Sequence, residues 1–220
     1  MNSKNSEFFT EVYVKGLWGT DESRSGNGSN LKQTTTIREH LSVLFRSLGV
    51  KKLLDAPCGD FYWMNRVELD VDEYIGADIV RELIEENRRR YEEPGRKFIV
   101  LDITEDEIPK VDLILCRDCL VHFSFRDISS ALENIKRSGS TYLLTTTFSE
   151  REKNEDIHTG DWQPYNLQQP PFNFPEPVSL INENCTIGDG IYADKCLGLW
   201  KISDICYPGG QPLVDKKRSA

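Results

Sequence analysis

At a length of 220 residues the chain can bury about 70% of its unfolded surface, enough for one domain without metal or disulfide crosslinks. Charged residues make up 29% and hydrophobic residues 38%, which is typical of a globular protein and excludes a disordered or fibrous one. The net charge of −9 argues against a large nucleic-acid footprint, because phosphate backbones are bound by clustered Lys and Arg. The sequence contains neither a long apolar run nor the apolar core of a secretory signal. We therefore expect a soluble, cytoplasmic protein without a membrane partner.

The first periodic pattern predicts a helix that ends at Gly49. Apolar residues between positions 37 and 48 recur at intervals of three and four, and the glycine directly follows the last of them. Short apolar runs then predict strands at 51–56, 74–77, 97–101, 111–116 and 141–145. Helix-like stretches at 81–91 and 127–138 separate several of them. This alternation is typical of βαβ units and predicts an α/β fold with a doubly wound, mostly parallel sheet.

The pattern changes after residue 148. Four prolines between residues 170 and 177 exclude a helix or a central strand there. Because long irregular connections usually have a function, we expect 149–185 to be a lid-like insertion over the substrate. The alternative is a stiff loop that covers the sheet edge. Strand-like segments at 190–195 and 197–205 predict a C-terminal antiparallel strand pair.

An aspartate stands at or just past the end of each of the first four predicted strands: Asp55, Asp78, Asp102 and Asp118. In parallel α/β sheets, ligands bind beyond the carboxyl ends of the strands. Carboxylates repel a pyrophosphate, so the series favours a positively charged ligand that carries hydroxyl groups and no phosphate. Asp78 lies 19 residues after Gly59, at the spacing where an acidic side chain hydrogen-bonds ribose hydroxyls.

These segments resemble the class I, Rossmann-like S-adenosylmethionine-dependent methyltransferases. The stretch Leu53–Phe61 is similar to the first motif of that family, an acidic residue followed by a glycine-rich turn. It departs from the motif at Pro57 and Phe61, where glycines are common. The resemblance covers about residues 50–148 and again the C-terminal strand pair.

The resemblance implies a single methyltransferase domain over residues 1–220 that binds S-adenosylmethionine (SAM) and releases S-adenosylhomocysteine (SAH). Its expected parts are an N-terminal cap and helix (1–49), a cofactor-binding core (50–148), the substrate-covering insertion (149–185), and the strand pair with a tail (186–220). In the family, Asp78 would bind the ribose, Asp102 and Ile103 the adenine, and Arg117 would adjoin the methyl-transfer site. The residues expected to bind the cofactor are Trp18, Ser25, Gly26, Asp55, Ala56, Pro57, Cys58, Gly59, Asp78, Ile79, Asp102, Ile103 and Arg117.

Asp118 and His122 are the candidate catalytic residues. They are four residues apart, so a helical turn after the fourth strand would place them on one face. If the acceptor is a hydroxyl or an amine, one of them can remove its proton. The alternative for His122 is a core histidine satisfied by backbone groups.

The insertion mixes aromatic rings with amides, a combination that suits a polar acceptor such as a saccharide or another small molecule. The candidate substrate-binding residues are His158, Trp162, Tyr165 and Asn173. We expect the protein to be a monomer or a homodimer. An alternative function is a non-catalytic cofactor-binding or interaction protein with the same fold, suggested by Pro57 and Phe61.

The six cysteines are not needed as disulfides in a chain of this length, and we expect them to be reduced. Cys116 and Cys119 have the spacing of a redox pair. The alternative is that both are small residues packed under a strand end. A zinc site would require a second pair of ligands, which is absent, so no metal is expected.

Overall fold

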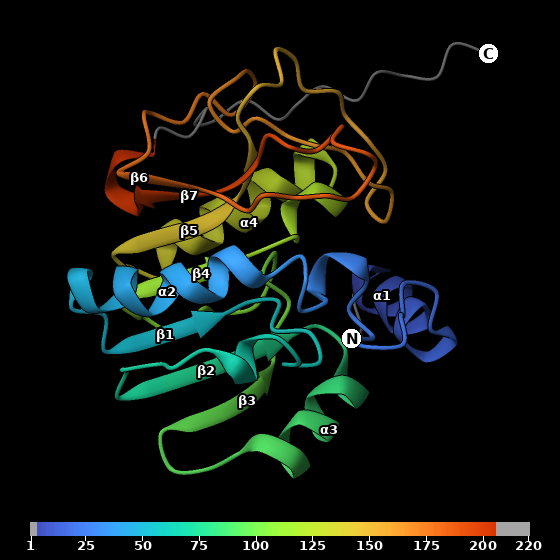
Figure 1. Cartoon of the computed structure of the whole chain (residues 1–220), viewed down its shortest axis with the longest axis vertical. Coiled ribbons are helices and arrows are strands. Elements are labelled where there is room, and N and C mark those ends of the chain that lie inside the picture. Colours follow the sequence, from blue (N-terminus) through green and yellow to red (C-terminus); the bar gives the residue numbers. More distant parts are fainter. Residues whose placement is uncertain (1–3, 206–220) are drawn as a thin grey trace.

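The computed structural model describes residues 4–205, which form a seven-stranded sheet with the order β3-β2-β1-β4-β5-β7-β6 (Figure 1). The strands are β1 (Lys52–Asp55), β2 (Glu73–Asp78), β3 (Arg96–Val100), β4 (Leu113–Cys116), β5 (Tyr142–Phe148), β6 (Ser179–Asn182) and β7 (Lys195–Lys201). Strands β1 to β5 pair in parallel, whereas β7 is antiparallel to β5 and β6. The predicted doubly wound α/β fold with antiparallel strands near its C-terminus is confirmed.

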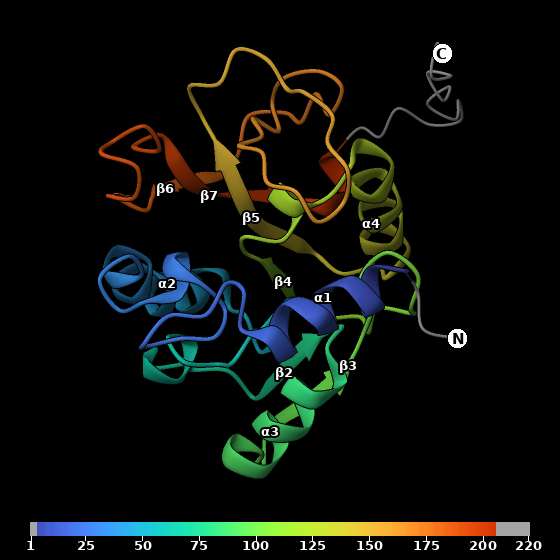
Figure 2. The same cartoon turned by 90° about the vertical axis from the view of Figure 1, so that its right-hand side faces the viewer.

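Apolar clusters cover both faces of the sheet, because successive residues of a strand point to opposite sides. Leu53 of β1 belongs to the cluster that contains the buried apolar residues of α2 (Thr35–Leu48) and α3 (Arg81–Tyr91). Leu54 belongs to the cluster that contains the buried apolar residues of α4 (Phe125–Arg137). Figure 2 shows α2 and α4 on opposite sides of the sheet.

The strand order reverses between β1 and β4, with β2 and β3 on one side and β5 on the other. Such a switch point leaves a crevice beyond the carboxyl ends of the strands. Helix α1 (Lys4–Lys15) lies beyond the ends of β1 and β2 (Figure 1). The N-terminal segment therefore stands next to the place where a ligand would bind.

The strand predicted at 190–195 is wrong. Residues 188–194 form turns, because Gly188, Asp189 and Gly190 all have positive φ. The antiparallel partner of β7 is instead β6, which lies within the stretch predicted as insertion. The strand predicted at 197–205 is β7, which ends at Lys201 and is followed by a short 3-10 helix, Ile202–Asp204. The predicted tail and Cys206 lie outside the described residues.

Residues 149–178 contain no helix or strand, and part of this segment is core. Tyr165, Leu167, Phe172 and Phe174 are buried in the same cluster as α4. The Tyr165 hydroxyl donates a hydrogen bond to the Phe123 carbonyl oxygen at 3.0 Å. This half of the insertion is therefore the sheet-covering loop of the alternative interpretation.

Within residues 4–205, no helix is both long and apolar enough to span a membrane.

Candidate active site

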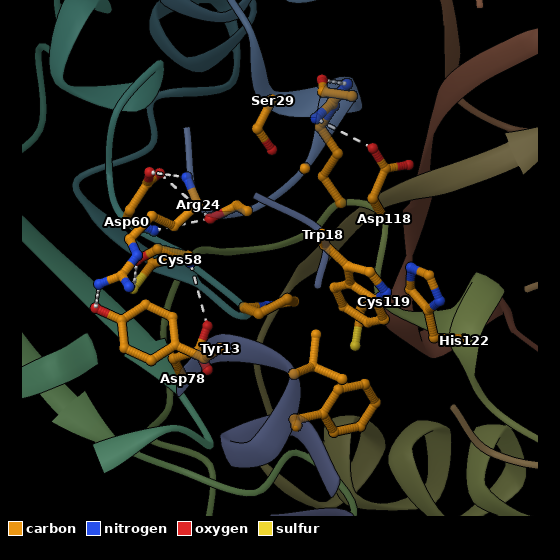
Figure 3. Close-up of a pocket in the computed structure, with 18 of the residues that line it drawn as sticks. Tyr13, Trp18, Arg24, Ser29, Cys58, Asp60, Asp78, Asp118, Cys119 and His122 are labelled. Carbon is orange, nitrogen blue, oxygen red and sulfur yellow. Dashed lines mark hydrogen bonds and ion pairs between the residues drawn. The ribbon is translucent and has the colours of Figure 1, made fainter. Parts of the chain in front are cut away.

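A cavity of about 630 Å³ opens at the carboxyl ends of the strands, at the switch point (Figure 3). Its walls come from the loops after β1, β2, β3 and β4, from α1 and the segment after it, and from the turns before β7. This volume lies within the usual range for small-molecule sites, about 300–1,000 Å³.

The loop after β1 is shaped by the end of β2. Cys58 N–H donates to the Ala77 carbonyl oxygen at 2.8 Å, and Gly59 N–H donates to Asp78 Oδ2 at 3.2 Å. Gly59 has a φ of +52°, and a Cβ there would lie 2.2 Å from Ser25 Oγ. Glycine is therefore required by both the backbone conformation and the close approach of Ser25.

Asp78 lines the cavity, as predicted. Its second oxygen, Oδ1, accepts a hydrogen bond from Val80 N–H at 3.0 Å. Burial raises the pKa of Asp78 to about 6 against the lowering effect of these backbone donors. At neutral pH the side chain is an ionised acceptor suited to hydroxyl donors.

Asp60 attaches the N-terminal segment to this loop. Its carboxylate accepts from Arg24 N–H at 2.8 Å, from Ser23 Oγ at 3.0 Å and from Ser25 Oγ at 3.2 Å. These bonds bring Ser25 and the neighbouring Gly26 into the cavity wall, where both were predicted.

Helix α1 contributes lining residues that the sequence analysis did not include: Phe9, Val12 and Tyr13. Tyr13 donates to Glu86 of α3 at 3.1 Å, which attaches α1 to the β2 side of the sheet. The apolar residues at positions 8, 9, 12 and 13 are spaced by three and four, a helical pattern that could have identified this cap.

The residues after β3, which were predicted to contact the adenine, also line the cavity. Asp102 and Ile103 both line it, and Asp102 Oδ1 accepts from Thr104 N–H at 2.9 Å. Ala56, Pro57, Cys58 and Ile79 line it as well, as predicted.

Asp55 was predicted to bind the cofactor, but it does not line the cavity. Its side chain is buried and its Oδ2 accepts the Tyr74 hydroxyl at 2.6 Å. Burial raises the pKa of Asp55 to about 7, although the Tyr74 hydrogen bond acts in the opposite direction. Asp55 is therefore a buried structural residue that links the end of β1 to β2 through Tyr74.

Four charged groups meet at the end of β4: Arg117, Asp118, Glu183 and Lys195. Arg117 donates to Glu183 through Nε at 3.2 Å and Nη2 at 2.6 Å, while Nη2 also donates to the Gly28 carbonyl oxygen at 2.9 Å. Lys195 Nζ lies 2.7 Å from Asp118 Oδ2 and 3.4 Å from Glu183 Oε2. The formal charges of this four-charge cluster balance. Glu183 and Lys195 were not predicted, because their partners are distant in sequence.

Asp118 is unsuited to accept a proton. Burial acts to raise the pKa of this carboxyl, but the charges of Arg117 and Lys195 outweigh burial and hold the pKa well below its usual range. The catalytic role predicted for Asp118 as a base is therefore disfavoured, while its place in the cavity wall agrees with the prediction.

His122 lies on the same side of the cavity as Asp118, away from Asp60 and Asp78 (Figure 3). Its Nδ1 is 3.0 Å from the Asp161 carbonyl oxygen. Because a carbonyl can only accept, Nδ1 carries the proton and Nε2 keeps its lone pair. Trp18 stacks on the imidazole with a centroid distance of 4.4 Å. Burial lowers the pKa of His122, so the ring is neutral at neutral pH.

Of the predicted substrate-binding residues, Trp162 lines the cavity. It contacts Phe148 and Tyr192 edge-on, with ring centroids 5.9 and 4.9 Å away. The other three predicted residues do not line it. His158 and Asn173 are exposed on the insertion, and Tyr165 is committed to the core.

The cysteines in the described residues are free thiols. Cys119 lines the cavity, whereas Cys116 is fully buried and does not line it. A hydrogen bond with Cys116, together with burial, raises the pKa of Cys119 well above its usual value. A redox pair needs the opposite shift, so the packing interpretation is favoured. No cluster of metal-ligating side chains occurs among residues 4–205.

Comparisons with known proteins show which family model part of the chain matches and which solved structures share its fold. Residues 53–139 match the family model described as a methyltransferase domain. Magnesium protoporphyrin IX methyltransferase from Synechocystis PCC 6803, solved with SAM, has a TM-score of 0.52 at 10% identity over 70% of this chain and 81% of that chain. Human N-acetylserotonin methyltransferase, also with SAM, has a TM-score of 0.55 at 15% identity over 90% and 60%. No curated protein sequence matches the chain.

At these identities the solved structures establish the fold, and the family match identifies the domain. Residues 53–139 therefore match a methyltransferase domain, and the chain has the Rossmann-like fold of the SAM-dependent methyltransferases with which it was compared, as the sequence resemblance implied. Both of these solved structures contain SAM.

Proposed function

We propose that the chain transfers the methyl group of SAM to a hydroxyl or amine of a small molecule or saccharide. The observation that carries this proposal is the neutral His122, whose Nε2 is left as a base in the cavity at the end of β4. SAM supplies an electrophilic methyl group on a positively charged sulfur. The residues of the chain have to bind the two reactants, exclude water and receive the proton of the acceptor.

The cavity residues fit this cofactor. Gly59 leaves space that a Cβ would fill, and Asp78 offers an acceptor for the ribose hydroxyls. Asp102 and Ile103 would contact the adenine, while Ser25, Gly26 and Trp18 of the N-terminal segment would close over the remainder. The acidic character of this side favours a sulfonium compound over a phosphate-bearing nucleotide.

His122 would remove the acceptor proton during the transfer. The Asp161 carbonyl fixes its ring and tautomer, and Trp18 covers one ring face. Asp118 would contribute as an ionised acceptor that binds substrate, because its pKa is held too low for proton transfer at neutral pH.

The departures from the first motif do not require a non-catalytic protein. Phe61 has a φ of +57° and is buried, with its ring 5.2 Å from those of both Tyr74 and Phe98. It therefore fills the core next to β2 rather than the cavity. Phe61 is therefore a core residue, and it does not alter the turn at Gly59.

The test is transfer of radiolabelled methyl from SAM to acceptors by wild type and His122→Gln. We expect kcat of His122→Gln to fall by about 10²–10⁴-fold, the usual contribution of a general base. The wild-type rate should fall as the pH drops through a pKa below the ordinary histidine value of 6.5, because the base must be neutral. The variant should lose this acid limb.

His40→Gln is the matched control. His40 is exposed on α2, where its Nδ1 contacts the Thr36 carbonyl oxygen. This variant should keep the wild-type rate and pH profile. A His122→Gln enzyme with the wild-type kcat at every pH would remove His122 from the proposed mechanism.

A further inference from the structure

Asp118 presents one carboxylate oxygen to the part of the cavity that would hold the acceptor. Oδ2 is enclosed by Lys195 Nζ at 2.7 Å and Arg117 Nη1 at 3.2 Å, and a Cβ at Gly28 would lie 2.9 Å from it. Oδ1 has a single long contact, 3.4 Å from Thr146 Oγ1. The Asp118 side chain nevertheless keeps 27% of its surface exposed. The oxygen left for a ligand is therefore Oδ1.

The same side of the cavity also contains a second hydrogen-bond acceptor, His122 Nε2. Residues 118 and 122 are joined by a short 3-10 helix, Leu120–His122, and both line the cavity. Figure 3 shows their side chains on the same side of the pocket. Both free atoms can only accept hydrogen bonds when Asp118 is ionised and His122 is neutral. A ligand that satisfies them must bring two neighbouring donors.

The cations of this wall are not available to an anionic acceptor. Arg117 is paired with Glu183 and Asp118, and Lys195 is paired with the same two carboxylates. A phosphate or carboxylate on the acceptor would face Asp118 without a free partner, and burying such a charge is costly. The wall therefore favours an acceptor without negative charge near its reacting group.

The same cavity is also lined by three aromatic residues, Phe148, Trp162 and Tyr192, whose rings are in mutual edge-on contact. Trp162 is 40% exposed, so part of its surface remains open to a ligand. An open indole suits the flat apolar side of a ring, and Tyr and Trp add polar edges that can hydrogen-bond to it.

We propose that the acceptor is a neutral saccharide ring with two adjacent hydroxyls, one directed to His122 Nε2 and the other to Asp118 Oδ1. This inference rests on the proposed function and narrows it. The hydroxyl at His122 is the one methylated: its oxygen forms the new bond to carbon as the bond from sulfur to that carbon breaks. The hydroxyl proton passes to Nε2, and the sulfur leaves as a neutral thioether. The ring stacks on Trp162.

The experiment measures transfer of labelled methyl from SAM to a defined panel. It contains methyl pyranosides of glucose, galactose and mannose, their monodeoxy analogues, catechol, phenol and ethanolamine. We expect transfer to at least one pyranoside. Removing the neighbouring hydroxyl should lower kcat/KM by about 10- to 100-fold, because it leaves an ionised carboxylate oxygen with only the long contact from Thr146.

Asp118→Asn tests the assignment of that hydroxyl. Asparagine tolerates the positive φ of 52° at this position, and its amide would no longer require a donor. The penalty for the deoxy analogue should shrink to less than about threefold in this variant. Asp189→Asn is the matched control, since Asp189 has a φ of 51°, is exposed and does not line the cavity. It should keep the full penalty.

An equal deoxy penalty in wild type and Asp118→Asn would overturn the role of Asp118. Transfer to phenol or ethanolamine but to no diol would overturn this inference while leaving methyl transfer itself established. Transfer to catechol but to no pyranoside would overturn the saccharide assignment. Transfer to no member of the panel also overturns this inference. The proposed function is then tested separately, by measuring whether the protein binds SAM.

Discussion

Among the aspartates at the strand ends, burial and partners decide which role each can have. Asp78 faces the cavity with backbone donors behind it, and Asp118 is held ionised by two cations. Asp55 is enclosed with the Tyr74 hydroxyl as its partner. Its pKa of about 7 lies above that of an unfolded aspartate, about 3.9. Protonation of Asp55 therefore stabilises the fold fully below the unfolded pKa, and this stabilisation is lost as the pH rises through about 7.

Asp55→Asn should therefore be more stable than wild type at high pH. The amide keeps an oxygen that can accept from Tyr74 and removes the ionisable group. We expect the free energy of unfolding to rise by about 1–3 kcal/mol at pH 8, with no gain at pH 4. Urea unfolding at the two pH values measures this. Asp70→Asn, an exposed position, should equal wild type, and an Asp55→Asn protein without a gain at pH 8 would contradict the raised pKa.

Residue positions at the cavity were largely predictable from the sequence, because the end of a parallel strand points to one edge of the sheet. This rule correctly identified Asp78, Asp102 and His122 as cavity residues. It failed for Asp55 because the rule locates the end of β1 and not each side chain there, and the Asp55 side chain is held by the Tyr74 hydroxyl of β2. The prediction for Tyr165 came instead from the aromatic and amide composition of the insertion, and Tyr165 lies in the core because aromatic residues in a loop suit a core as well as a binding site.

Among the elements, the N-terminal segment depends on the turn at Gly59. Gly59→Ala would place a methyl group 2.2 Å from Ser25 Oγ and disrupt the contacts of residues 23–25 with Asp60. We expect the affinity for SAM to fall by about tenfold or more, equivalent to the loss of one or two hydrogen bonds. Limited proteolysis within residues 16–30 should accelerate.

Gly49→Ala controls for backbone strain. Gly49 has a φ of +66° at the end of α2, and a Cβ there would meet no atom within 4 Å. Both variants therefore carry the cost of an alanine in the left-handed region, about 1 kcal/mol. If Gly49→Ala weakens SAM binding as much as Gly59→Ala does, the contact with Ser25 is not what holds the segment.

The central strands were the elements best predicted, since each is a short apolar run buried on both faces. Helix α1 was missed because its mixed composition hid a helical spacing of apolar residues. Strand β6 was missed because it is short and half exposed, with a burial pattern set by β7. The insertion combines a core half with the exposed Trp162, a division that depends on packing against Phe123 and α4.

For the molecule as a whole, the cavity is closed by contacts between distant parts of the chain. The four-charge cluster joins β4 to Glu183 after β6, to Lys195 at the start of β7 and, through Gly28, to the N-terminal segment. Sequence periodicity describes neighbours along the chain, so it predicted Arg117 and Asp118 and could not predict their partners. Removing Arg117 or Glu183, whose side chains are 3% and 1% exposed, would leave the other as an unpaired buried charge, which is strongly destabilising.

The most direct test of the account is calorimetric titration of the protein with SAM and SAH, using wild type and Asp78→Asn, at pH 7.5 and pH 5. We predict that wild type binds both ligands, that Asp78→Asn binds about tenfold or more weakly, and that wild-type affinity drops as the pH falls through about 6, the pKa of Asp78. The variant should show no such pH step. Absence of binding to either ligand, or binding by Asp78→Asn as tight as that of wild type at both pH values, would contradict the assignment of this cavity as the cofactor site.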